Sequence, residues 1–163
     1  AKHLSTSKAL TIDVIKNVIK EKKIKDSYIL LLQATSPFRT LEMTNSFLKK
    51  FKKSKNTNSS VSLTRFFHPH PEKIQIIEKN FVKSYLNKES MRPRQYLPEV
   101  YCLNGLFYIA KSEQLVNKNS FFSNKTSPFI VKYDQSLNLD LPDDLLILKD
   151  KIKKKIIHQN FLK

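Results

Sequence analysis

The sequence predicts an α/β fold with a mostly parallel sheet, helices on both of its faces and a small antiparallel excursion. Segments with helical periodicity alternate with short apolar segments, which is typical of a doubly wound layout. Residues 29–32 are four apolar residues in a row. Such a run suits a strand that is covered on both faces, as in a parallel sheet.

A polar loop follows the strand that is predicted over residues 28–33. It contains Gln33, Ser36 and Arg39, and Thr40 can cap the helix that follows. In open α/β sheets, ligands bind in the crevice beyond the carboxyl ends of the strands. The loop is therefore the first candidate for a binding site.

The remaining elements follow from periodicity and from turn residues. Apolar residues recur at spacings of three and four in the first helix, which Ser5, Thr6 or Ser7 could cap. Pro142 opens a closing helix that has lysines near its C-terminal end. The first helix is expected over residues 5–23, and further helices over residues 41–53 and 112–116. Further strands are expected over residues 59–64, 103–110 and 129–131.

Residues 66–100 are expected to leave the main sheet. His68 and His70 alternate with prolines, residues 73–83 indicate a hairpin, and residues 87–99 contain too many prolines for a helix. Segments of this kind often carry sites or contacts between subunits. A His-x-His pair can bind a metal, but no third ligand stands close by, so we interpret these histidines as loop lining.

The composition limits the class of protein. With 163 residues, the chain can form one domain with a core. No apolar run approaches the roughly 18 residues of a membrane-spanning helix. The single cysteine, Cys102, fits a reducing cytoplasm and a place in the core. We therefore expect a cytoplasmic protein without a membrane segment.

The formal net charge of +16 raises the question of a nucleic-acid partner. The excess consists mostly of lysines, and no stripe of arginines and aromatic residues interleaves with them. Such lysine runs are more often solvated helix faces, so we expect no specific nucleic-acid site. Gly105 is the one glycine, so these residues contain no Gly-rich phosphate loop.

Several motifs resemble those of a known family. Residues 31–39 read L-L-Q-A-T-S-P-F-R and resemble the L-L-Q-P-T-S-P-L-R segment of the acylneuraminate cytidylyltransferases. Residues 94–98 (R-Q-Y-L-P) and 104–109 (N-G-L-F-Y-I) resemble that family's R-Q-x-L-P and N-G-A-I-Y-I segments. The remaining matches, in the same order, are Phe121, Phe122, Leu139 and Asp140.

The resemblance implies a Rossmann-like nucleotide-diphospho-sugar transferase fold and a homodimer formed through an extension of the sheet. It implies an enzyme that joins CTP to a nine-carbon 2-keto sugar acid and releases pyrophosphate, with Mg²⁺ as cofactor. The family opens with a strand and a basic, Gly-containing loop that holds the triphosphate. We expect that segment before Ala1, so residues 1–163 would be a single, incomplete domain that is inactive alone.

The resemblance also implies roles for single residues. Gln33 would contact sugar hydroxyls, and Arg94 would bind the sugar carboxylate through its planar fork. Gly105 would adopt a positive φ or let the backbone approach a ligand. The residues by themselves leave a surface role for Arg94 and a core role for Tyr108 open. The other substrate-binding residues that the resemblance implies are Ser36, Arg39, Asn104, Tyr108, Phe121 and Phe122.

Asp140 is the implied catalytic residue and metal ligand, because a carboxylate suits Mg²⁺. The family pattern is D-I-D, and this chain has Asn138 at the first position. We therefore expect a weaker metal site that uses Asn138 and Asp140. Asp143 and Asp144 lie nearby, and we interpret them as acids at the start of a helix.

Two other functions stay open. A catalytically inactive or truncated relative could serve as a sugar-acid-binding or dimer-forming module, and Asn138 favours this alternative. A basic nucleic-acid binder would show a steep salt dependence of binding.

Overall fold

The computed structural model describes residues 4–6, 8–87 and 91–154. Ser7 and residues 88–90 of the predicted irregular stretch lie outside the described residues. The helices are α1 (Thr11–Glu21), α2 (Leu41–Lys53), α3 (Ser112–Lys118) and α4 (Pro142–Lys153). The strands are β1 (Tyr28–Leu31), β2 (Ser59–Phe66), β3 (Gln75–Glu78), β4 (Phe81–Ser84), β5 (Val100–Lys111) and β6 (Ser127–Val131). Short 3-10 turns are η2 (Pro71–Lys73), η3 (Arg94–Tyr96) and η4 (Tyr133–Gln135).

The predicted α/β architecture is confirmed. Four strands form one sheet in the order β1-β5-β2-β6, and β3 pairs with β4 in a separate antiparallel hairpin. β2 and β6 are parallel, whereas β5 is antiparallel to both β1 and β2. Three strands therefore point one way and β5 points the other. The reversal arises because the chain returns from β2 to β5 without a crossover helix.

The expectation that this segment is a strand covered on both faces is confirmed for residues 29–31, because Ile29 and Leu31 pack against the cluster with α1 and α3 and Leu30 packs against the cluster with α2. β1 pairs with β5 and with no second strand among the described residues, so it forms an edge of the sheet. Tyr28 and Leu32 are exposed, and the residues between them are half-buried. An edge strand lacks the neighbour that would complete its burial.

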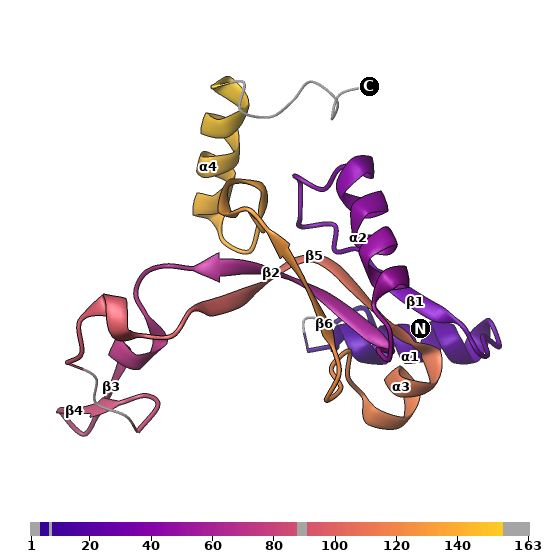
Figure 1. The fold of residues 1–163 in the computed structure, drawn as a ribbon, viewed down its shortest axis with the longest axis horizontal. Helices are drawn as coiled ribbons and strands as arrows, with labels where there is room; N and C mark the ends of the chain where they lie inside the picture. The colour runs from indigo at the N-terminus through magenta and orange to yellow at the C-terminus, as the bar shows by residue number, and fades with distance from the viewer. Residues whose placement is uncertain (1–3, 7, 88–90, 155–163) are drawn as a thin grey trace.

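Helices cover both faces of the sheet, as predicted. α1 and α3 lie on one face and α2 lies on the other (Figure 1). On the first face, Ile15 and Ile19 of α1 pack in one cluster with Leu115 of α3. On the second face, Phe107 of β5 stacks on Phe47 of α2 with ring centroids 4.9 Å apart. The two clusters hold β5 between layers of helices.

The helix predicted from residue 5 begins at Thr11 instead. Leu10 stands at its N-cap position in an extended conformation and makes no side-chain cap. The residues that anchor the helix, Ile15 and Ile19, lie beyond this point. The start of the helix therefore follows from the burial of its apolar face. The polar residues 5–7, which could have capped an earlier start, do not determine it. The helix predicted over residues 41–53 is confirmed, with Thr40 accepting a cap hydrogen bond from the Met43 N–H.

The chain between β2 and β5 forms an arm, defined here as residues 66–100. β2 and β5 continue past the other strands as a two-stranded ribbon that ends in the β3–β4 hairpin, far from β1 (Figure 1). The hairpin predicted over residues 73–83 is thus confirmed. Cys102 lies on this ribbon and is exposed, which corrects its predicted place in the core. No helix packs on the ribbon there, as the run of exposed residues 101–103 shows.

None of the described helices is long and apolar enough to cross a membrane.

Candidate functional site

A wide bulge in β5 lies at the centre of the candidate site. β2 and β5 pair at Val61 with Tyr108 and again at Leu63 with Leu103. Between these pairs β2 has one residue, Ser62, whereas β5 has residues 104–107. Bulges of this kind bend a strand and redirect its side chains, and they are frequent beside active sites.

Gly105 is the residue that the bulge presses against its neighbours. Its φ of +75° lies in a region that other residues rarely adopt. A Cβ added there would lie 2.5 Å from Gln33 Oε1, 3.2 Å from Asn138 Oδ1 and 3.2 Å from Ser36 Oγ. Three polar side chains from two distant segments therefore surround one glycine, which confirms the positive φ predicted for it.

Hydrogen bonds fasten these two segments to each other. The Ser36 hydroxyl donates to Asn138 Oδ1 at 3.2 Å, and the Leu139 N–H donates to the Thr35 carbonyl at 2.8 Å. The loop after β1 and the segment before α4 thus form one wall. It lies at the carboxyl end of β1, where the sequence placed the candidate site.

Asp140 is exposed and held by its neighbours. Asn138 Nδ2 lies 2.9 Å and 2.8 Å from the two carboxylate oxygens of Asp140 and donates to them. The N–H groups of Asp140 and Leu141 donate to Asp144 Oδ2 at 2.8 and 2.7 Å. Asp144 therefore caps α4, as its interpretation as a helix-terminal acid predicted, and Asp140 keeps its carboxylate available.

Tyr108 connects this wall to the core. Burial raises the pKa of its hydroxyl above the ordinary value. A hydrogen bond with the Gly105 backbone lowers that pKa and the negative charge of Asp140 raises it. The hydroxyl therefore lies beside the bulge and within electrostatic reach of Asp140. Its ring packs against Phe121, with centroids 5.5 Å apart.

Arg39 holds the loop against the bulge. Its Nε donates to the Leu106 carbonyl at 3.0 Å and its Nη2 donates to the Gln33 carbonyl. The guanidinium also lies 5.9 Å from the centroid of the Phe107 ring, and burial lowers its pKa. These contacts give Arg39 a positioning role, while its predicted contact with a substrate stays a prediction.

Asn104 is buried and faces β2. Its Oδ1 accepts from the Ser62 hydroxyl, and its Nδ2 donates to Thr64 Oγ1. The predicted contact of Asn104 with a substrate stays a prediction, but its hydrogen bonds in the structure are internal. Sequence reasoning missed Ser62 and Thr64. A signal was present, because Ser60, Ser62 and Thr64 place hydroxyls at alternate positions of one strand.

The two adjacent phenylalanines separate in the structure. Phe121 is buried in the core cluster with α1 and α3, whereas 47% of Phe122 is exposed. Only Phe122 therefore has an exposed ring that a ligand could contact. The predicted contacts of Phe121 and Phe122 with a substrate stay predictions.

Arg94 lies far from the predicted site residues that surround Gly105. It is exposed in η3 within the arm, which projects away from β1 (Figure 1). The neighbouring Arg92 makes an ion pair with Glu72 at 2.8 Å, so the arm uses it locally. No described contact joins Arg94 to Gln33 within one chain.

The described residues contain no group of three or more His, Cys, Asp or Glu side chains that could hold a metal. His70 lines the base of the arm, as interpreted from the sequence. Its Nδ1 accepts from the Glu72 N–H and its Nε2 lies 3.1 Å from the Pro98 carbonyl. Asp140 and Asn138 thus supply one carboxylate and one amide. That set fits Mg²⁺ only where phosphates and water provide most of the ligands.

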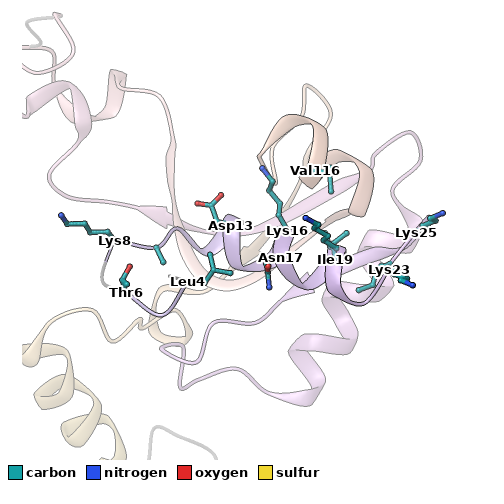
Figure 2. Close-up of a pocket in the computed structure, with 13 residues that line it drawn as sticks. Leu4, Thr6, Lys8, Asp13, Lys16, Asn17, Ile19, Lys23, Lys25 and Val116 are labelled. Atoms are coloured by element: carbon teal, nitrogen blue, oxygen red, sulfur yellow. The ribbon is translucent and has the colours of Figure 1, made fainter. Parts of the chain in front are cut away.

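A groove of about 950 Å³ lies elsewhere, along α1 (Figure 2). Apolar residues such as Ile19 and Val116 line it together with lysines. None of the predicted site residues contributes to it. The lysines that line it are Lys8, Lys16, Lys20, Lys23 and Lys25.

Comparison with known proteins gives the family context. No model of a known protein family matches the chain. It is 25% identical over 144 residues to an N-acylneuraminate cytidylyltransferase of Streptococcus agalactiae, which covers 88% of this chain and 34% of that protein. It is 31% identical over 126 residues to a CMP-N,N'-diacetyllegionaminic acid synthase of Legionella pneumophila, which covers 71% of this chain and 50% of that protein.

The chain is similar to the acylneuraminate cytidylyltransferases. A third relative, the post-translational flagellin modification protein B of Campylobacter coli, is 26% identical over 157 residues, 94% of this chain and 66% of that protein. The chain thus spans between about a third and two thirds of the length of these curated relatives.

We predict that Gly105→Ala destabilises the fold and that part of the cost depends on Gln33. The new Cβ meets Gln33 Oε1 at 2.5 Å, and a left-handed conformation costs a non-glycine residue about 1–2 kcal/mol. Removing that oxygen with Gln33→Ala leaves the conformational cost and the 3.2 Å contacts with Asn138 Oδ1 and Ser36 Oγ. Urea denaturation of the wild type, both single variants and the double variant measures the difference. Equal costs of Gly105→Ala with and without Gln33 would show that the two do not touch.

Proposed function

We propose that this chain is the sugar-acid-binding part of a cytidylyltransferase, which activates a nine-carbon 2-keto sugar acid with CTP and releases pyrophosphate. The observation that carries the proposal is the gathering of Gln33, Ser36, Asn138 and Asp140 around Gly105. These residues come from separate parts of the chain, and all of them except Asn138 match family motifs. The similarity to a sialic-acid and a legionaminic-acid enzyme supports the same substrate class.

The residues around Gly105 suit a hydroxylated ligand. The carboxamide of Gln33 can both donate to and accept from sugar hydroxyls, and Phe122 offers an exposed aromatic surface near the loop that holds Phe121. Binding both substrates in one orientation lowers the entropic cost of reaction. Asp140 would hold Mg²⁺, and Asn138 would join it after its amide turns Oδ1 toward Asp140 in place of Nδ2. The cation would neutralise the phosphates of CTP and the pyrophosphate leaving group.

A homodimer would bring Arg94 to a site. The arm exposes a set of apolar side chains that nothing in the described chain covers, and such patches mark interaction surfaces. We propose that two arms pack together and that Arg94 of one chain binds the sugar carboxylate in the site of the other. The exposed apolar residues of the arm are Ile77, Phe81, Val82, Tyr85, Met91 and Tyr96.

A second candidate is a binding module without catalysis. The observation that favours it is the hydrogen-bonded pair of Asn138 and Asp140, which holds the carboxylate without a metal. In this case the site would bind the sugar acid but would not turn over CTP.

We predict that Gln33→Ala lowers kcat/KM for the sugar acid about tenfold, the effect of losing one or two hydrogen bonds. The KM for CTP should stay the same. Pyrophosphate release from CTP is measured on the full-length gene product with N-acetylneuraminic acid and with legionaminic acid. The matched control is Gln135→Ala, an exposed glutamine in η4. If Gln33→Ala changes kcat/KM for the sugar acid no more than this control does, Gln33 does not contact the sugar acid.

We predict that Arg94→Ala abolishes use of the sugar acid, whereas Arg92→Ala does not. If Arg94 acts across a dimer, a mixture of subunits carrying Arg94→Ala and Gln33→Ala should recover activity. The recovery arises because one of the two sites in a mixed dimer contains both wild-type residues. Activity of each variant alone and of the coexpressed pair is compared. Lack of recovery, in a protein shown to be dimeric by sedimentation, would place Arg94 in its own chain's site.

We predict that Asn138→Asp lowers thermal stability without a divalent cation and that Mg²⁺ restores it. A second carboxylate would lie against Asp140 at the distance of the present hydrogen bonds, 2.8–2.9 Å, and would repel it. A bound Mg²⁺ would remove that repulsion, raising Tm by about 2–4 °C for each kcal/mol gained. Asn124→Asp, in an exposed loop, is the control for the added charge. An equal response of both variants to Mg²⁺ would argue against a cation site here.

A further inference from the structure

The bulge in β5 leaves buried backbone groups that the strand ladder cannot pair. Leu106 and Phe107 are fully buried, and both lie among residues 104–107, which face a single residue of β2. A buried N–H without a partner is costly. Side chains supply the partners: the Leu106 N–H donates to Asn104 Oδ1 at 3.2 Å, and the Phe107 N–H donates to Ser62 Oγ at 2.8 Å.

Ser62 serves both ends of the bulge. Its hydroxyl accepts from the Phe107 N–H and lies 2.5 Å from Asn104 Oδ1 and 3.2 Å from the Phe107 carbonyl. A hydroxyl has one proton to donate, and the shorter contact, to Asn104, takes it. Ser62 therefore clamps the first and last residues of the bulge with one oxygen atom.

The clamp is fixed to the neighbouring strand as well. Asn104 Nδ2 donates to Thr64 Oγ1 at 3.0 Å, and Thr64 Oγ1 donates to the Val131 carbonyl of β6 at 3.2 Å. Ser62, Thr64 and Asn104 are all buried. The network thus spans β5, β2 and β6, and a missing member leaves buried polar partners without a hydrogen bond.

Gly105 lies between the clamped residues, so its place depends on them. We propose that Ser62 is a positioning residue, which holds Gly105 against Gln33, Ser36 and Asn138 and thereby shapes the sugar-acid site. The part of this inference that concerns a ligand rests on the proposed function. The part that concerns the position of Gly105 does not.

Ser60 provides a matched control on the same strand. Like Ser62 it is buried, and its hydroxyl also makes a hydrogen bond to a neighbouring strand, at 2.8 Å to the Ser127 carbonyl. It has no described contact with the bulge. Ser60→Ala and Ser62→Ala therefore remove the same group from equally buried positions, and only the second should move Gly105.

Gly105 can be observed directly because it is the only glycine among residues 1–163. In the full-length protein, labelling with ¹⁵N-glycine together with carbonyl-¹³C-asparagine selects the amide of any glycine that follows an asparagine, which within residues 1–163 is Gly105 after Asn104. We expect Ser62→Ala to shift or broaden the Gly105 resonance and Ser60→Ala to leave it near its wild-type position. An unchanged resonance in Ser62→Ala, or equal shifts in both variants, overturns the proposal. If Ser62→Ala does not fold, Ser62→Cys keeps the volume, weakens the hydrogen bonds and is judged by the same criteria.

Titration with N-acetylneuraminic acid, in the presence of CTP and Mg²⁺, tests the link to the ligand. We expect the sugar acid to shift the Gly105 resonance in the wild type, and its affinity to fall about tenfold in Ser62→Ala but less than twofold in Ser60→Ala. Equal losses in the two variants overturn the positioning role. If the sugar acid shifts the resonance in none of the proteins, the proposed function fails. The position of the Gly105 resonance without ligand still decides the inference about Ser62.

Discussion

The difference in length between β2 and β5 is the constraint on which the candidate site depends. Four residues of β5 stand opposite Ser62, so the strand must bulge and its buried amides must find side-chain partners. The bulge moves Gly105 out of the regular ladder and against Gln33 and Asn138. Glycine is favoured because the φ of +75° strains any other residue and a Cβ would push Gln33 Oε1 aside and crowd Asn138 and Ser36.

The charge of the whole chain and the charge at the wall around Gly105 have opposite signs. The net charge of +16 favours the approach of anions in general. At the wall itself, however, Asp140 is negative and Asn138 is neutral. An aspartate at position 138 would need a cation to offset the repulsion, whereas the amide holds Asp140 by hydrogen bonds. With Asn138 beside Asp140, the site is therefore less dependent on a bound metal for its stability than it would be with two carboxylates.

The arm divides the molecule into a body that holds the wall around Gly105 and a ribbon that carries Arg94. This division explains why residues that match motifs of one family do not all meet within one chain. The apolar residues at the end of the arm have no partner among the described residues, which is the arrangement expected of a surface that packs against another subunit. Completing the site between two chains would make binding depend on assembly.

Local sequence determined much of this protein. Helical periodicity predicted α2 to the residue, turn residues predicted the β3–β4 hairpin, and a lone glycine beside polar motifs predicted a special backbone position at Gly105. The tertiary structure decided the rest: that β1 is an edge, that Phe121 is buried while Phe122 is exposed, and that Asn104 bonds to Ser62. The last of these outcomes depends on the register between β2 and β5, in which Ser62 and Asn104 are 42 residues apart in sequence. Periodicity and propensity act over a few residues, so they specify which segments become strands but not how far one strand slides along another.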